Sequence, residues 1–189
     1  MDRHGSGKLT IRRMTAEDIG QVVKVERACF SEPWSEEVFH ATLLLPYAYY
    51  YVAEITADDG NSGCEHSSGF GGDHGSSADD VGAPDHESGS RIIGECGVRD
   101  IVGEGEITNV AVLPEFQGSG IASRMLRTLL DDSVKRGMTA FTLEVREGND
   151  PAVSLYRKFG FITEGVRTGF YENPVEDALI MWKRDHSLP

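Results

Sequence analysis

The feature that most constrains the fold is a strand, a glycine-containing turn and a helix that follow one another over residues 106–136. Residues 106–113 are rich in β-branched side chains, which favours a strand, and Pro114 ends it because proline cannot donate a ladder hydrogen bond. From Ile121 onward the apolar residues recur at helical spacing, and Gly137 is placed to stop the helix. The apolar helix face is expected to consist of Ile121, Met125, Leu126, Leu129, Leu130 and Val134.

Two glycines, Gly118 and Gly120, leave the backbone bare where the first turn of the helix offers unpaired N–H groups. Such a position favours a phosphate or pyrophosphate. Ordinary tight connections before helices also contain glycine, so the glycines alone leave both interpretations open. A P-loop is excluded because no Gly-Lys-Ser/Thr follows. A dinucleotide fingerprint fits poorly, because Ser123 replaces the third glycine and Glu144 lies in the middle of a predicted strand.

The rest of the sequence alternates between strand-like and helix-like segments. Strands are expected at residues 8–13, 47–55, 91–99, 140–146, from 160 onward and at 178–182; helices are expected to begin near residues 15, 35 and 149. Within 140–146, alternation places Phe141, Leu143 and Val145 toward the core and Thr142, Glu144 and Arg146 away from it. The mixture indicates an α/β fold.

The length and composition suit one cytoplasmic domain. A chain of 189 residues can bury a full core. No apolar run reaches the ~18 residues needed to span a bilayer, and no apolar signal segment begins the chain. Cys29, Cys64 and Cys96 are odd in number and widely spaced, which suggests neither a disulfide framework nor a zinc pattern. We therefore expect a cytoplasmic protein without membrane contact.

Residues 57–90 differ from the rest in composition. They hold eight Gly, seven Ser and eight acidic residues with no Lys or Arg, so −5 of the net charge of −13 belongs to the remaining chain. The overall acidity argues against direct nucleic-acid binding. The segment offers little apolar surface, which predicts a disordered insertion. Cys64, His66, His74 and His86 lie within it, but their irregular spacing favours a solvated insertion over a zinc or nickel site.

The turn also carries a family signature, since Gln117-Gly118-Ser119-Gly120-Ile121-Ala122 matches the pattern Gln/Arg-x-x-Gly-x-Gly/Ala. Downstream, matching residues follow in order: Leu143-Glu144-Val145-Arg146, Asn149, Ala152, Leu155-Tyr156 and Phe159-Gly160-Phe161. Over residues 8–51 and 91–184 the chain resembles the RimI-type ribosomal-protein-alanine N-acetyltransferases of the GNAT (GCN5-related N-acetyltransferase) superfamily. The resemblance implies one domain at 8–184, interrupted by the 57–90 insertion, with flexible tails at 1–7 and 185–189. It also implies a mixed, mostly antiparallel seven-strand sheet with helices on both faces and splayed central strands.

The resemblance further implies acetyl-CoA as co-substrate and no metal. In the family this molecule wedges between two splayed strands, here the strand that ends at Val112 and the strand that holds Glu144. The backbone N–H groups of Val110 and Val112 would bind the pantetheine and the thioester carbonyl, and the glycine turn would bind the pyrophosphate. The expected contacts are Val110, Ala111, Val112, Gln117, Gly118, Ser119, Gly120, Ile121, Ala122, Ser123 and Asn149.

The resemblance also assigns catalytic and acceptor residues. Glu144 matches the general base and Tyr156 the general acid toward the sulfur; without the resemblance they would be a solvated strand residue and a helix-face aromatic. Trp34, Phe170 and Tyr171 would flank the opening for the acceptor, although Trp34 could equally be a packing aromatic. Two departures weaken the acceptor assignment: the family's Tyr-Tyr pair is Phe170-Tyr171 here, and a second arginine is replaced by Thr168.

The function implied is acetyl-CoA-dependent acetylation of a protein N-terminus, with the N-terminal alanine of a small-subunit ribosomal protein as the type substrate. Two alternatives remain: a GNAT enzyme acting on a lysine side chain or a small amine, and a non-catalytic module that senses acyl-CoA. The presence of both Glu144 and Tyr156 argues against the sensor, because binding alone needs neither residue.

Overall fold

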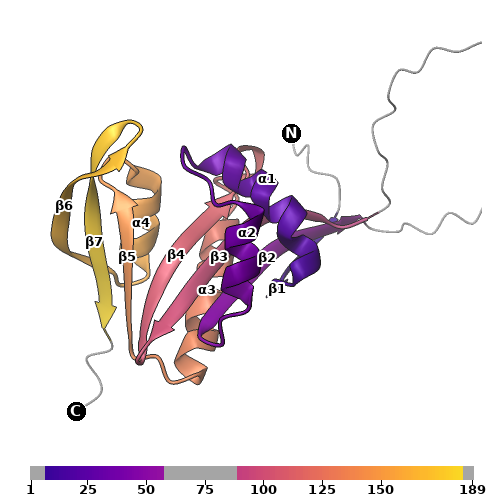
Figure 1. Ribbon diagram of the computed structural model, residues 1–189, viewed down its shortest axis with the longest axis horizontal. Coiled ribbons are helices and arrows are strands. Elements are labelled where there is room, and N and C mark those ends of the chain that lie inside the picture. The colour runs from indigo at the N-terminus through magenta and orange to yellow at the C-terminus, as the bar shows by residue number, and fades with distance from the viewer. Residues whose placement is uncertain (1–6, 58–88, 185–189) are drawn as a thin grey trace, which may run out of the picture.

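One seven-stranded sheet organises the chain in a computed structural model that describes residues 7–57 and 89–184 (Figure 1). The strand order is β1-β2-β3-β4-β5-β7-β6. The strands are β1 (Gly7–Arg13), β2 (Ala48–Ala57), β3 (Arg91–Ile101), β4 (Glu104–Val112), β5 (Ala140–Arg146), β6 (Ile162–Glu172) and β7 (Val175–Arg184). All neighbouring pairs are antiparallel except β4 and β5, which run parallel. The expected fold class is confirmed.

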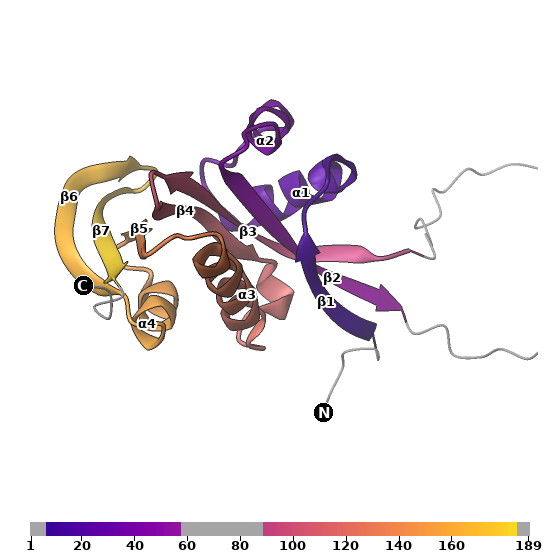
Figure 2. The same ribbon diagram turned by 90° about the horizontal axis from the view of Figure 1, so that it is seen from below.

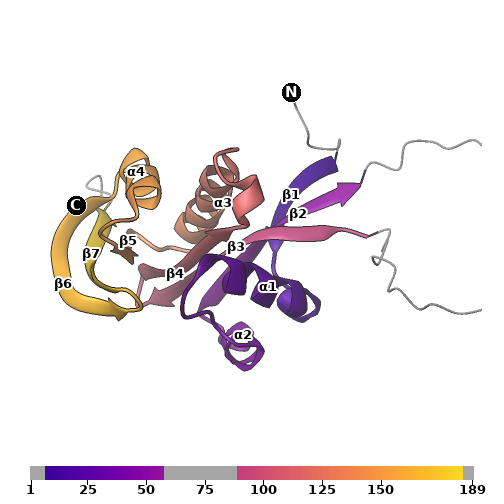
Figure 3. The same ribbon diagram turned by 90° about the horizontal axis from the view of Figure 1, so that it is seen from above.

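Helices cover both faces of this sheet. Helices α1 (Ile19–Cys29) and α2 (Glu36–Leu43) lie on one face, and α3 (Ile121–Lys135) and α4 (Asp150–Lys158) lie on the other (Figures 2 and 3). Short 3₁₀ turns, η1 (Ala16–Asp18) and η2 (Pro114–Phe116), precede α1 and α3. The described part of the chain contains no helix long and apolar enough to cross a membrane.

The two central strands separate soon after they begin to pair. Strand β4 pairs with β5 only from Glu104 opposite Ala140 to Ile107 opposite Leu143, although both strands continue beyond those residues. Beside the point of separation, β4 contains a bulge, where the pairing with β3 shifts between Gly97 and Val98. A bulge increases local twist and bends the strand. The predicted splay of the central strands is therefore present.

Helix α3 follows the predicted periodicity with one exception. Ile121, Met125, Leu126, Leu129 and Leu130 are all buried. The expectation for Val134 is wrong, because its side chain is 57 % exposed while Ser133 is buried in its place. The helix is nearly complete at this point, and Arg136 and Gly137 fold back onto its last turn. Gly137 adopts the left-handed conformation expected of a stop residue, with φ of 98°.

Strand β7 extends further than predicted. Strand β7 starts at Val175 and ends at Arg184, rather than spanning residues 178–182. The reason is its pairing on both sides, with β5 and with β6. Tertiary pairing of this kind extends strands past the point where apolar alternation fades.

Gly97 provides a test of how closely β3 packs against the side chain of Tyr50 on β2. A Cβ on Gly97 would lie 2.0 Å from the ring of Tyr50, which is fully buried. We expect Gly97→Ala to destabilise the protein by about 1–3 kcal/mol, because the ring must move within a close-packed core. Gly20→Ala is the control: the added Cβ on α1 would meet nothing within 4 Å, so stability should be unchanged or higher. Urea unfolding of both variants measures this, and equal stabilities would contradict the packing argument.

Candidate active site

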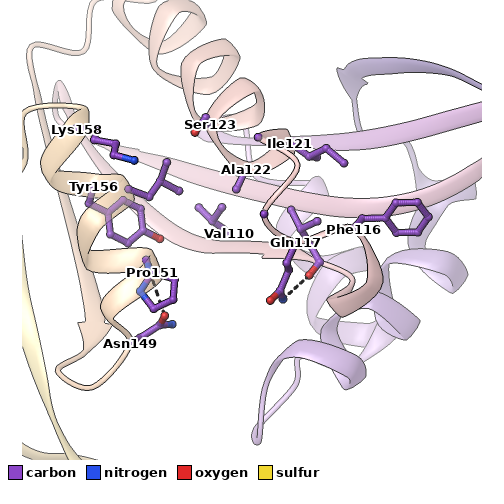
Figure 4. A pocket seen from close by; sticks show the side chains of 15 residues that line it. Val110, Phe116, Gln117, Ile121, Ala122, Ser123, Asn149, Pro151, Tyr156 and Lys158 are labelled. Atoms are coloured by element: carbon purple, nitrogen blue, oxygen red, sulfur yellow. Dashed lines mark hydrogen bonds between the residues drawn. The ribbon is translucent and has the colours of Figure 1, made fainter. Parts of the chain in front are cut away.

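A pocket of about 400 Å³ opens between the turn before α3 and helix α4 (Figure 4). Its size is in the range of small-molecule sites, about 300–1,000 Å³. It is lined by Val110, Val112, Phe116, Gln117, Gly118, Gly120, Ile121, Ala122, Ser123, Asn149, Pro151, Ala152, Leu155, Tyr156 and Lys158. Nine of these are residues expected to contact the cofactor, and Tyr156 is the expected acid. Ala111 and Ser119 are not among the lining residues.

The glycine turn has the geometry of an anion cradle. Gly118 and Gly120 both have positive φ, 75° and 83°, and a Cβ on either would point into open space. Gly120 directly precedes α3, so the first N–H groups of that helix are unpaired at the pocket. The Gln117 side chain donates from Nε2 to the Val112 carbonyl at 2.9 Å, and Ser119 Oγ donates to the Phe116 carbonyl. These bonds fix the turn against the end of β4.

The backbone of β4 directs two N–H groups away from the sheet. The N–H of Leu113 donates to the Ile93 carbonyl on β3 at 2.9 Å. Because successive N–H groups of a strand point to opposite edges, those of Val112 and Val110 point away from β3. On that side β5 has already parted from β4 beyond Ile107. These donors therefore face the space between the two strands.

Helix α4 supplies the opposite wall. The Asn149 side chain caps the helix by accepting a hydrogen bond from the Ala152 N–H at 3.2 Å. Tyr156 is 7 % exposed, and Figure 4 shows its hydroxyl directed into the pocket. Within the described residues this hydroxyl has no hydrogen-bond partner. Burial, and then the nearby Cys96, Tyr171 and Glu95 side chains, raise the pKa of Tyr156, so its proton is retained at neutral and alkaline pH.

Sequence reasoning missed five lining residues: Phe116, Pro151, Ala152, Leu155 and Lys158. Lys158 is the informative one, because it places a cation at the end of α4 in the same pocket as the glycine turn. Its position two residues after Tyr156 and two before Gly160 was visible in the sequence. The apolar residues were not recognisable, because their use depends on how α4 sits against β4.

The expected base lies on the other face of the sheet. Glu144 is on the face of β5 opposite Leu143 and Val145, which are buried. Its Oε1 accepts a hydrogen bond from Arg167 Nη1 of β6 at 2.9 Å, and its side chain is 34 % exposed. Glu144 is therefore accessible and oriented by an arginine, and it does not line the cofactor pocket.

Arg146, on the same face of β5, joins two loops beside Glu144. Its guanidinium donates to Ser31 Oγ after α1, and to the carbonyls of Asn173 and Pro174 between β6 and β7. It also pairs with Glu176 at 3.1 Å and stacks 4.1 Å from the centre of the Tyr171 ring. We call the bridge from Ser31 through Arg146 to Asn173 and Pro174 the strap.

Of the expected acceptor residues, Tyr171 and Phe170 lie near Glu144, and Trp34 has a packing role. Burial raises the pKa of Tyr171, and the charges of Glu144 and Glu176 raise it further, while the charge of Arg146 opposes the shift. Phe170 stacks under Arg167 at 4.3 Å. The Trp34 ring lies 5.5 Å from Phe39 and 6.2 Å from Tyr50, so it packs under α2; contact with an acceptor stays a prediction.

Among the described residues, no group of three or more His, Cys, Asp or Glu side chains could hold a metal ion. The candidate ligands of the insertion, Cys64, His66, His74 and His86, lie outside those residues.

Comparison with known proteins identifies the family. Residues 73–161 match the Acetyltransferase (GNAT) family model. The N-alpha-acetyltransferase RimI of Mycobacterium tuberculosis is 30 % identical over 96 % of this chain and 95 % of its own length. The chain belongs to the GNAT acetyltransferases. A Bacillus subtilis protein, provisionally named as a [ribosomal protein bS18]-alanine N-acetyltransferase, is 31 % identical over 93 % of this chain and 95 % of its own.

The GNAT fold is also evident from a solved structure. The ribosomal-protein-S18-alanine N-acetyltransferase from Escherichia coli superposes with a TM-score of 0.69 at 22 % identity, covering 96 % of this chain and 99 % of that one. The pocket, the cradle and the gap between β4 and β5 described above are thus features of a GNAT acetyltransferase.

The cradle can be tested with two matched glycines. Gly120→Ala should weaken acetyl-CoA binding at least tenfold, about 1.4 kcal/mol, because a Cβ would occupy the space that an approaching pyrophosphate needs. Gly137→Ala is the control, because Gly137 also has a positive φ and open surroundings but lies at the far end of α3. Both variants carry similar backbone strain. Isothermal calorimetry that showed the same affinity for both would place the cofactor elsewhere.

Proposed function

We propose that the protein transfers the acetyl group of acetyl-CoA to the α-amine of a protein N-terminus, most specifically the N-terminal alanine of a small-subunit ribosomal protein. The observation that supports this proposal is the end of β4–β5 pairing at Ile107, because it leaves a gap between the pocket on the α3/α4 face and Glu144 on the other face. The names of two relatives, which describe them as [ribosomal protein bS18]-alanine N-acetyltransferases, support this acceptor class.

The residues of the pocket divide the binding of acetyl-CoA between them. The cradle at Gly118 and Gly120 suits the pyrophosphate, and Lys158 adds a positive charge at the same pocket. Acetyl-CoA supplies the activated thioester. The N–H groups of Val110 and Val112 would donate hydrogen bonds to the pantetheine and stabilise negative charge on the thioester carbonyl oxygen.

Two side chains from opposite faces would move the protons. Glu144, exposed and held by Arg167, would take a proton from the acceptor amine directly or through water. Tyr156, buried with its proton retained, would return one to the leaving thiolate. Proton transfer of this kind contributes about 10²–10⁴ in rate, so positioning by the two strands must supply the rest.

The choice of amine follows from the cost of deprotonation. An α-amine has a pKa of about 7.7–8.0 and a lysine about 10.4, so at pH 7 deprotonation costs about 1.2 kcal/mol for the first and about 4.6 kcal/mol for the second. A single exposed carboxylate such as Glu144 suits the smaller cost. An N-terminus is also a chain end, which can reach Glu144 beside the strap.

A peptide with a free N-terminal alanine and an internal lysine tests the assignment. We expect tandem mass spectrometry to find acetyl on the alanine α-amine, with peptides beginning Ser or Gly reacting more slowly. Acetyl mainly on the lysine would replace the proposal by the lysine-directed alternative. Acetyl-CoA binding without transfer to any amine would support the sensor.

The pH dependence of activity distinguishes the proposed roles of Glu144 and Tyr156. Glu144→Gln should lose most activity near pH 7 and recover part of it as pH rises, because free amine becomes abundant without a base. Tyr156→Phe should lower turnover by about 10², because a CoA thiol with a pKa near 8.5 leaves fairly well unaided. That loss should not recover with pH, and acetyl-CoA affinity should stay nearly intact. Tyr47→Phe, at an exposed tyrosine, is the control; unchanged turnover in Tyr156→Phe would remove Tyr156 from the role of acid.

A further inference from the structure

Glu95 is a buried carboxyl that the proposed mechanism does not use. It lies on β3 with 0 % of its surface exposed, and neither of its oxygens has a hydrogen-bond partner among the described residues. Such groups are rare in folded proteins. Burial, and then the charge of Glu26, raise the pKa of Glu95 well above its usual range, which favours the protonated, neutral carboxyl.

Glu26 of α1, a neighbour of Glu95, connects the segment between α1 and α2 to strand β4. It is 1 % exposed. Its Oε2 accepts from the Trp34 backbone N–H at 2.9 Å, and its Oε1 accepts from Asn109 Nδ2 at 3.0 Å. Trp34 lies between α1 and α2, and Asn109 precedes Val110, a lining residue of the pocket. One carboxylate therefore ties the α1–α2 connection to β4.

The side chains that act on Glu95 are acidic or neutral. Glu95 is influenced by Glu26 of α1 and Asn109 of β4, and it in turn raises the pKa of Cys29 on α1 and Tyr50 on β2. On the other face of β3 it also raises the pKa of Cys96, and that of Tyr156 of α4. Since Glu26 is acidic and Asn109 is neutral, a proton on Glu95 avoids two negative charges facing each other in the protein interior.

We propose that Glu95 is a positioning residue for the acceptor side, because its protonated carboxyl offers a proton to Glu26 and keeps Glu26 bound to both Trp34 and Asn109. No group among the described residues donates a hydrogen bond to either Glu95 oxygen, and the neighbouring Glu26 carboxylate is the acceptor open to a protonated Glu95. A carboxylate has lone pairs for a third bond beyond the two it already accepts. Without that donor, we expect Glu26 to be held less firmly between Trp34 and Asn109, and the α1–α2 connection to become more mobile.

Two substitutions separate positioning from packing. Glu95→Gln keeps the shape and an N–H donor, so it should bind the acceptor peptide within about twofold of the parent protein. Glu95→Leu keeps the volume but has no donor, so the KM for the peptide should rise about five- to tenfold with the KM for acetyl-CoA unchanged. An apolar group of similar shape at a buried polar site is often neutral or stabilising, so Glu95→Leu should melt no lower than the parent. Ile93→Val, a buried residue on the same face of β3, should lower stability without changing the peptide KM.

A second measurement does not depend on the acceptor. The chain has two tryptophans, so Trp182→Phe leaves Trp34 as the fluorescent reporter. In that background we expect acrylamide to quench Trp34 at least twofold more strongly in Glu95→Leu than in Glu95→Gln. The proposal rests on the proposed function only for the peptide KM; if no N-terminal peptide is acetylated, the quenching result still decides it. Equal quenching in the two variants, or an unchanged peptide KM in Glu95→Leu, would overturn the positioning role.

Discussion

The site depends on how briefly β4 and β5 pair. Four residue pairs hold the strands together from Glu104 to Ile107, and after that each strand follows a different partner. Strand β4 stays with β3, and β5 stays with β7 along its whole length. Backbone donors that a continuous sheet would have consumed are therefore left unpaired at Val110 and Val112. Buried backbone groups of this kind are costly unless a ligand or water forms hydrogen bonds with them, which predicts that the gap binds a ligand.

Much of the fold was readable from the sequence because local signals and tertiary pairing agree there. The strand, glycine turn and helix around Gly118 and Gly120 have the predicted conformation, and most of the residues on them that were expected to contact the cofactor line one pocket. The prediction for Val134 was wrong because periodicity cannot tell where a helix leaves the core, and Ser133 took the buried place. The strand ends of β7 were also missed, because its two neighbours, rather than its own apolar residues, set its length.

The acceptor side was harder to predict because its residues act through contacts between distant segments. Trp34 is used for packing under α2, and its backbone N–H serves Glu26. Glu95 gave no sequence signal, since a glutamate in an apolar strand resembles a solvated position until its burial is known. Arg146 likewise depends on two loops, one from each half of the chain, meeting above β5. Polar networks of this sort exist only in the folded protein.

Because side chains alternate between the two faces of β4 and β5, the sheet separates two groups of site residues. Asn109 and Glu144 project toward α1 and α2, while Val110 and Tyr156 meet on the side of α3 and α4. An acetyl donor and an amine acceptor that bind on opposite faces of the sheet can enter and leave independently, so neither has to dissociate before the other binds. Both would then be bound when the acetyl group is transferred. This arrangement favours direct transfer within a ternary complex over a ping-pong cycle.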